Sequence, residues 1–297
     1  MCRHLGYVGP PVAVGELVVR GAHSLYTQSW APAEMRGGGT INADGFGVAW
    51  WRRAEVGMDG AREAVTRYRN AAPIWTDPAV VEVLGQLESR SVVAAVRSAT
   101  VGMPVERAAC APFVDEHWAF SHNGVVPDWR TTMPLVLADL DEFLVRAASI
   151  GAQGADVPGL VTPTRPFGSP AALLRAESLT DSAALWVLLR GLLGAITPDG
   201  PITSPADALR LLVATVLRYQ PSARLNLLLG NGAELWATTC WHALSVLVAE
   251  DHTVLSSEPY DDDPRWQPID DRRLAVAGPG HCTVSALELP VTERVRS

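Results

Sequence analysis

Short apolar runs separated by turn residues occupy both ends of the chain, and this pattern is typical of β-strands. The clearest run, residues 91–96, is valine-rich and almost wholly apolar, which predicts a central strand buried on both faces. A strand over residues 2–8 is predicted to end at the chain breaker Gly9-Pro10-Pro11, and a strand over 118–122 to end at the turn dipeptide Asn123-Gly124. The other predicted strands cover residues 48–51, 64–68, 225–229, 235–239, 244–248, 253–257, 274–277 and 282–287.

A helical spacing of apolar residues takes over in the middle of the chain. Leucines recur every three and four residues after Asp181, and a second helix is predicted from Ser204. Further helices are predicted over 77–87 and 138–150; the second of these lies in the segment 131–170, which we interpret as a surface insertion. The order of strands, helices and strands predicts two sheets with helices outside, an α+β layered fold.

The amino-acid composition excludes or disfavours several classes of protein. All 24 basic residues among the 297 are arginine, which excludes a lysine Schiff base and a phosphate-loop lysine. The formal net charge of −8 disfavours nucleic-acid binding, and no apolar stretch approaches the length of a membrane span, so neither a nucleic acid nor a membrane is expected as a partner.

The chain start and the cysteines predict a cytoplasmic protein. No basic region followed by an apolar stretch opens the chain, so no secretory signal is expected. The four cysteines are Cys2, Cys110, Cys240 and Cys282, and they are scattered without the paired spacing of a zinc site. We therefore expect reduced thiols and no bound metal.

Cys2 is the first candidate catalytic residue. Methionine is normally removed before a small second residue, which would leave a thiol and a free α-amine on one residue. Thiols and α-amines ordinarily have pKa values of about 8.5 and about 7.7–8.0, close enough for the amine to accept the thiol proton. The resulting thiolate would be a good nucleophile toward an amide carbonyl. Considered alone, Cys2 fits better as a small buried thiol at the start of a strand.

Four further residues, at three places in the chain, could complete a site, and each place has a structural alternative. Arg97 follows the buried strand 91–96 and could hold a carboxylate bidentately, or it could form a surface ion pair. Asn123 and Gly124 could stabilise an oxyanion, or form an ordinary hairpin turn. Asp181 could bind a substrate ammonium group, or stabilise the start of its helix.

In this chain order, Cys2, Arg97-Ser98-Ala99-Thr100, Ser121-His122-Asn123-Gly124 and Ser178–Ser182 resemble the class II glutamine amidotransferases, which are N-terminal-nucleophile hydrolases. The resemblance implies a four-layer αββα sandwich of two mainly antiparallel sheets, forming a single domain over residues 2–290 with the insertion at 131–170. It also implies a role for each position: Cys2 is the nucleophile and its α-amine the base, Asn123 and Gly124 form the oxyanion hole, Arg97 holds the α-carboxylate of a glutamyl group, and Asp181 its α-amine. Ser98 and Thr100, on the same loop as Arg97, are expected to contact the substrate.

Longer blocks narrow the resemblance to hydrolases of this family that cleave a γ-glutamyl amide in ergothioneine biosynthesis. The implied reaction releases glutamate through a glutamyl thioester and requires no metal or organic cofactor. Ammonia-channelling relatives often carry Trp and His where this chain has Ser98 and Val101, which favours a simple hydrolase. The blocks are residues 1–5 (MCRHL), 28–32 (QSWAP), 42–47 (NADGFG), 94–104 (AAVRSATVGMP), 121–125 (SHNGV), 223–227 (ARLNL) and 257–264 (SEPYDDDP).

The other half of such a substrate carries an imidazole and a trimethylammonium betaine. A quaternary ammonium cannot donate a hydrogen bond and prefers aromatic faces with carboxylates nearby. Tyr260, which precedes three aspartates, and Trp30 are the candidates for contacting it. Core packing is the alternative for both aromatic residues, and a solvated loop is the alternative for the acidic run.

Two other functions remain open at the level of sequence. The first is a glutaminase subunit that supplies ammonia to a partner synthetase, and the second is a non-catalytic protein that kept the fold.

The expected partner is a small-molecule γ-glutamyl substrate. The sequence is also compatible with a homodimer.

Overall fold

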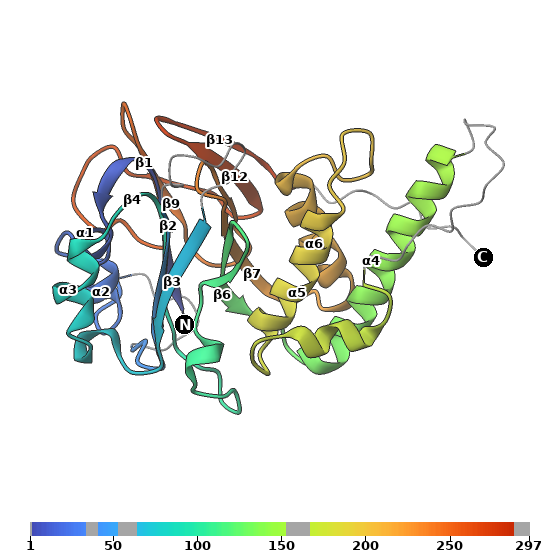
Figure 1. Cartoon of the computed structure of the whole chain (residues 1–297), viewed down its shortest axis with the longest axis horizontal. Helices are drawn as coiled ribbons and strands as arrows, with labels where there is room; N and C mark the ends of the chain where they lie inside the picture. Colours follow the sequence, from blue (N-terminus) through green and yellow to red (C-terminus); the bar gives the residue numbers. More distant parts are fainter. Residues whose placement is uncertain (1, 34–40, 53–63, 153–166, 288–297) are drawn as a thin grey trace.

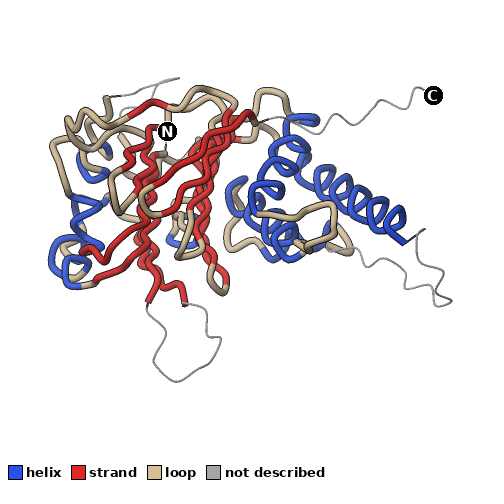
Figure 2. The backbone as a smooth tube through the Cα atoms, turned by 90° about the horizontal axis from the view of Figure 1, so that it is seen from above, coloured by secondary structure: helices blue, strands red, loops and turns tan. Residues whose placement is uncertain are grey.

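Two antiparallel β-sheets lie face to face at the centre of the molecule, and helices cover the outer face of each (Figure 1). The structure is a computed structural model, and it describes residues 2–33, 41–52, 64–152 and 167–287. Seen from above, the strands form a central block with helices on either side (Figure 2).

The first sheet has seven strands, and β1, which carries the start of the chain, lies between β10 and β4. In spatial order the strands are β11 (Gln267–Pro268), β9 (Ser245–Val248), β10 (Thr253–Ser256), β1 (Arg3–Ala13), β4 (Glu88–Val96), β2 (Phe46–Arg52) and β3 (Ala64–Asn70). The second sheet has six strands, in the order β13 (His281–Ala286), β12 (Arg273–Gly278), β8 (Leu235–Thr238), β7 (Arg224–Gly230), β6 (Trp118–Val125) and β5 (Phe113–Asp115).

Helices form the two outer layers. The first sheet is covered by α1 (Val14–Val19), α2 (Leu25–Gln28) and α3 (Ala79–Glu82), and the second by α4 (Trp129–Ala152), α5 (Asp181–Gly194) and α6 (Pro205–Tyr219). Four short 3-10 helices complete the described chain: η1 (Ile74–Thr76), η2 (Leu84–Gln86), η3 (Arg107–Ala109) and η4 (Pro170–Arg175).

Three apolar layers hold the sandwich together. Between the sheets, Trp51 and Val93 of the first sheet pack with Leu228 and Leu235 of the second, and all four are almost fully buried. Separate apolar clusters join each sheet to its helices. Because burial of apolar surface is the main stabilising term in folding, these layers fix the spacing of the two sheets. The predicted αββα, α+β architecture is therefore confirmed.

The two long helices also begin where the sequence predicts. The Thr180 side chain caps α5 by accepting from the backbone N–H of Ala183, and Ser204 caps α6 by accepting from the N–H of Asp207. Strands β7 to β10, β12 and β13 lie within two residues of their predicted bounds.

Three local predictions are wrong. Strand β1 does not stop at Gly9-Pro10-Pro11; it continues to Ala13 across an irregularity in its pairing with β4, so the prolines cost no ladder hydrogen bond there. Asn123-Gly124 is not a hairpin turn, because both residues lie inside β6 and pair with β7. The helix expected over 77–87 is broken into α3 and η2.

Helix α4 contains the predicted helix 138–150 and extends it by about two turns toward the sheet. Met133, Val136, Leu137 and Leu140 are buried in the cluster that α4 shares with α5 and α6. This part of the expected insertion is thus integral to the helical layer, whereas residues 153–166 lie outside the described residues. The division of the chain into domains stays a prediction.

None of the helices within the described ranges is both long enough and apolar enough to span a bilayer.

The contact between the sheets predicts the effect of truncating a core residue. Replacing Leu228, which is fully buried between the sheets, by alanine should lower the free energy of unfolding by about 2–5 kcal/mol, because it removes apolar contacts and leaves a cavity. Leu174→Ala is the matched control, because Leu174 is 86% exposed and its truncation should change stability by less than about 0.5 kcal/mol. Urea unfolding followed by circular dichroism measures both. Equal values for the two variants would contradict this description of the core.

Candidate active site

Strand ends from both sheets meet at one end of the sandwich. Cys2 directly precedes β1, and Arg97 directly follows β4; since Arg3 pairs with Val96 in the antiparallel register, the chain start lies beside Arg97. The end of β6, with Asn123, approaches the same place from the second sheet, because it contacts Ser257 just after β10. Cys2, Arg97 and Asn123 are thus brought to the same end of the two sheets.

The Cys2 thiol points toward the loop that follows β4. Its Sγ donates a long hydrogen bond to the Ser98 carbonyl oxygen, 3.8 Å away, and the residue is half-buried. Asp44 holds this loop in place, since its carboxylate accepts from the Ala99 N–H at 2.7 Å and its carbonyl oxygen accepts from an Arg97 guanidinium N–H at 3.4 Å. The half-buried Arg97 guanidinium therefore lies one residue from the Cys2 contact.

Asn123 is joined to the β1 strand through a shared hydroxyl. Its amide nitrogen lies 3.4 Å from Ser257 Oγ, and the same oxygen accepts from the His4 backbone N–H at 3.0 Å. Asn123 is 1% exposed, and its amide oxygen finds no hydrogen-bond partner among the described residues. A buried acceptor without a partner is costly, which is typical of a position where a ligand or water completes the site.

Only glycine fits at position 124. A Cβ atom there would lie 1.9 Å from the backbone oxygen of Arg224 on the neighbouring strand, and that oxygen belongs to rigid paired backbone. The close approach of β7 therefore fixes this residue type next to Asn123.

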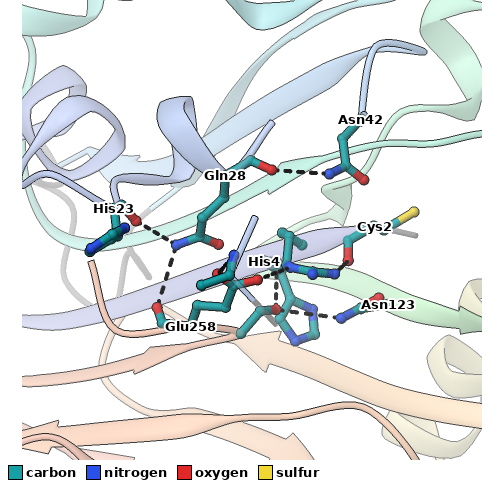
Figure 3. Close-up of polar contacts among 10 residues, drawn as sticks. Cys2, His4, His23, Gln28, Asn42, Asn123 and Glu258 are labelled. Carbon is teal, nitrogen blue, oxygen red and sulfur yellow. Dashed lines mark hydrogen bonds and ion pairs between the residues drawn. The ribbon is translucent and has the colours of Figure 1, made fainter. Parts of the chain in front are cut away.

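A buried ion pair holds the backbone of Cys2 (Figure 3). Arg3 Nε donates to Glu258 at 2.7 Å, and a second guanidinium N–H of Arg3 donates to the Cys2 carbonyl oxygen at 3.1 Å. The other Glu258 oxygen accepts from the Ala33 N–H at 2.8 Å. Gln28 donates to the Glu258 carbonyl oxygen, and Asn42 donates to the Gln28 carbonyl oxygen, which extends the network to α2. Figure 3 shows the Cys2 sulfur directed away from this network.

Two histidines near Cys2 are held neutral. Burial, with smaller contributions from His122 and the other neighbouring charges, lowers the pKa of His4 to about 3. Burial likewise lowers the pKa of His242 to about 3, with Arg224 and Arg3 adding to the effect. His4 Nδ1 lies 3.3 Å from Ser121 Oγ, and its buried Nε2 has no hydrogen-bond partner among the described residues, so a charged ring would be left uncompensated.

Asp181 lies at the junction of α5 and the end of β6. Its carboxylate accepts from the N–H groups of Val126 and Ser182, each at 2.8 Å, and the residue is 6% exposed. Among the described residues, these contacts tie it to the strand that carries Asn123 and not directly to Cys2 or Arg97. Both of the interpretations open at the level of sequence, helix capping and ammonium binding, are compatible with this position.

The remaining residues predicted to contact the substrate differ in their exposure to solvent. Trp30 is 41% exposed and makes edge contacts with Tyr26 and Trp75, and Thr100 is exposed on the loop after Arg97. Tyr260 is 2% exposed and packs in the cluster under α1, which favours core packing over ligand contact. Burial also raises the pKa of Tyr260, with Asp261 adding to it.

A large cavity of about 1090 Å³ lies at the other end of the sandwich. It is lined by Val8 of β1, Arg90 near the start of β4, Trp118 at the start of β6 and Asn231 just after β7. Arg90, Trp118 and Asn231 lie at the opposite ends of their strands from Arg97, Asn123 and Arg224, and Val8 lies in the middle of β1, away from Cys2. The cavity is therefore separate from the site at Cys2.

An antiparallel αββα sandwich with a cysteine at residue 2, an arginine after the neighbouring strand and an Asn-Gly pair facing them is the arrangement expected of a class II glutamine amidotransferase. The family described as "Glutamine amidotransferases class-II" matches residues 22–138. Proteins named "Gamma-glutamyl-hercynylcysteine sulfoxide hydrolase" are similar over nearly the whole chain: the one from Mycolicibacterium smegmatis is 37% identical over 97% of this chain and 100% of its own, and one from Mycobacterium tuberculosis is 38% identical over 97% of each. The chain belongs to the class II glutamine amidotransferase family.

Solved structures agree on the fold. A glutamine aminotransferase class-II domain protein from Silicibacter pomeroyi superposes with a TM-score of 0.53 at 20% identity, covering 96% of this chain and 99% of that one. Glutamine phosphoribosylpyrophosphate amidotransferase from B. subtilis superposes with a TM-score of 0.54 at 14% identity, covering 96% of this chain and 49% of that one. At these identities the likeness concerns the fold.

Sequence reasoning did not find the residues that support Cys2. The family resemblance covers these residues, because Arg3 lies in the block 1–5 and Ser257 and Glu258 lie in the block 257–264. The sequence assigns none of them a role. Their pairing spans 255 positions, and no local spacing marks it. The blocks themselves were the signal, since both carry polar residues next to predicted strands.

The two neutral histidines predict loss of stability in acid. Their folded-state pKa of about 3 lies below the ordinary value of 6.5, so between these pH values the unfolded chain binds protons that the folded chain does not. The free energy of unfolding should therefore fall as pH drops from about 6.5, by about 1.4 kcal/mol per pH unit for each histidine. Urea unfolding between pH 7 and 4.5 measures the slope. His242→Gln should reduce it, whereas the exposed control His281→Gln should not; an unchanged slope in His242→Gln would contradict the assignment.

The Arg3–Glu258 pair predicts a second stability effect. Glu258→Gln should destabilise the fold by about 3–5 kcal/mol, because it leaves the Arg3 guanidinium buried without its counter-charge. Glu16→Gln is the matched control, since the Glu16–Arg20 pair is about half exposed and worth less than about 1 kcal/mol. Urea unfolding at pH 7 compares the two, and a Glu258→Gln variant as stable as Glu16→Gln would rule out a structural role for the ion pair.

Proposed function

We propose that this protein is an amidohydrolase that cleaves the γ-glutamyl amide of γ-glutamyl-hercynylcysteine sulfoxide, a step of ergothioneine biosynthesis, and releases glutamate and hercynylcysteine sulfoxide. The observation that carries the proposal is the similarity over 97% of the chain to proteins of that name, together with the position of Cys2 next to the loop of Arg97.

Cys2 is the nucleophile in this proposal, after removal of Met1. Its α-amine accepts the thiol proton, directly or through one water, and the thiolate attacks the γ-carbonyl carbon. The Arg3 contact to the Cys2 carbonyl oxygen supports this role, because it fixes the backbone that carries both the thiol and the amine.

The oxyanion that forms is stabilised by Asn123 and Gly124. An amide nitrogen carries two N–H groups, so Asn123 can donate one to Ser257 and the other to the oxyanion. The Gly124 backbone N–H supplies the second donor. Removal of one donor of this kind typically raises the barrier by about 3–4 kcal/mol.

Collapse of the intermediate breaks the amide C–N bond. The leaving amine takes the proton that the α-amine had accepted, and the glutamyl group stays on the sulfur as a thioester. Water then attacks the thioester carbonyl, and glutamate and the free thiol are formed. Each step uses groups of the chain, the substrate and water.

Two charged side chains complement the glutamyl end. Arg97 holds the α-carboxylate through its guanidinium fork, and Asp181 holds the α-ammonium group. The half-buried position of Arg97 beside the Cys2 loop and the buried carboxylate of Asp181 beside β6 support these roles. Ser98 and Thr100, on the Arg97 loop, and the exposed ring of Trp30 complete the proposed substrate contacts.

The nucleophile assignment predicts a loss of activity without loss of fold. Cys2→Ala should lower kcat/KM for glutamate release from the sulfoxide by several orders of magnitude, because no other described group occupies the position of the thiol. Cys282→Ala is the matched control and should keep full activity, because Cys282 lies on β13, away from the strand ends at Cys2. Coupled detection of glutamate measures the rate, and far-UV circular dichroism checks the fold.

Further measurements separate the alternatives. Intact mass should show a chain shorter by the initiator methionine. Wild-type protein should prefer the sulfoxide over free glutamine in kcat/KM; a preference for glutamine would instead support the glutaminase alternative. Normal turnover by Cys2→Ala, or full activity with Met1 retained, would refute the mechanism.

A further inference from the structure

The connection between β8 and β9, residues 239–244, crosses from the second sheet to the first at the Cys2 end of the sandwich. Its end is fixed by register, because Ser245 of β9 pairs with Ser256 of β10, which in turn pairs with Leu5 of β1. Its middle is fixed by Asn226, whose amide oxygen accepts from the His242 N–H at 3.0 Å and which pairs with Asn123 across β6 and β7.

Trp241 occupies a strained position in this connection. Its φ of 93° lies in the region that side chains other than glycine rarely adopt, and its indole is 54% exposed. The Trp241 backbone N–H donates to Asp271 at 2.7 Å, which holds the conformation in place. Such strain costs about 1–3 kcal/mol and clusters at functional sites, so an exposed indole held this way is a candidate ligand contact.

Arg224 lies beside this indole and beside the proposed oxyanion hole. Its guanidinium carbon is 5.9 Å from the centre of the Trp241 ring. Its backbone oxygen accepts from His122 at 2.9 Å and lies so close to Gly124 that no Cβ fits there. The backbone of Arg224 therefore adjoins Gly124, while its side chain faces Trp241.

The order of strands places Trp241, on the connection from β8 to β9, on the opposite side of Cys2 from Arg97, whereas Arg224 of β7 faces β1 and β4. Strand β4, which leads to Arg97, flanks β1 on one side, and β10 and β9 flank it on the other. The strands of the second sheet follow the same order across the sandwich, because β3 packs against β5 at one edge and β9 packs against β13 at the other. A substrate whose glutamyl end points to Arg97 can therefore extend its leaving half past Arg224 toward the 239–244 connection.

We infer that Trp241 and Arg224 form the binding site for the leaving half of the substrate, a betaine that carries a quaternary ammonium and a carboxylate. The indole face attracts the quaternary ammonium, which has no hydrogen-bond donor, and the guanidinium pairs with the carboxylate. The inference rests on the proposed hydrolysis for the identity of the substrate.

Matched substitutions at Trp241 test the site. Trp241→Leu should lower kcat/KM for the sulfoxide about five- to thirtyfold, mainly through KM, because an apolar side chain without a ring loses the cation–π contact. Trp241→Phe should recover most of that loss. Arg224→Gln should also raise KM. With γ-glutamylcysteine, which lacks the betaine, the Trp241 variants should keep the wild-type kcat/KM. Tyr219→Leu truncates a partly exposed aromatic residue at the end of α6 and should leave kcat/KM unchanged for both substrates.

Calorimetry gives a readout that does not depend on turnover. In the Cys2→Ala background, the trimethylammonium betaine of histidine should bind at least fivefold more weakly when Trp241 is leucine. Equal losses on both substrates, equal losses in the Leu and Phe variants, or unchanged betaine binding would overturn the site. If wild-type protein cleaves no γ-glutamyl amide but betaine binding still depends on Trp241, the proposed function fails and the binding site stands. If it cleaves the sulfoxide and Trp241→Leu changes nothing, the hydrolase stands and the site fails.

Discussion

The buried ion pair between Arg3 and Glu258 fixes the part of the chain on which the proposed chemistry depends. The first residues of a chain usually fray, because ordering them costs conformational entropy and few contacts repay it. Here β1 is an interior strand, paired with β4 on one side and β10 on the other, and the Arg3 guanidinium holds the Cys2 carbonyl oxygen. The described start of the chain is thereby tied to the interior of the sheet.

The same anchoring links the site to segments far away in the sequence. Glu258 connects Arg3 to the N–H of Ala33, and Ser257 connects the backbone of His4 to Asn123 in the other sheet. Because these links are buried, we expect substitutions just after β10 to alter the position of residue 2. The neutral His4 belongs to the same buried region. Protonation of His4 in acid should therefore destabilise both the fold and the contacts that position Cys2.

The local pattern of apolar residues was enough to predict the layers and most strands. The apolar run 91–96 and the leucine spacing after Asp181 each favour one type of element strongly. It failed where tertiary contacts decided the outcome. Asn123-Gly124 is a strong turn signal, yet pairing with β7 and the close approach of Arg224 keep it inside a strand. The candidate site followed from chain order and resemblance. The partners of Cys2 did not, since an ion pair across 255 positions leaves no periodic trace.

Covalent labelling with a glutamine analogue that carries a diazoketone at the γ-position tests the central claim most directly, because a glutamyl pocket concentrates the reagent beside its nucleophile. Peptide mass spectrometry after one-equivalent labelling should find the adduct on Cys2, in an N-terminal peptide that lacks Met1, and competition by glutamate should suppress it. An adduct on Cys110, Cys240 or Cys282 instead, or labelling of Cys2 with Met1 still attached, would contradict the account.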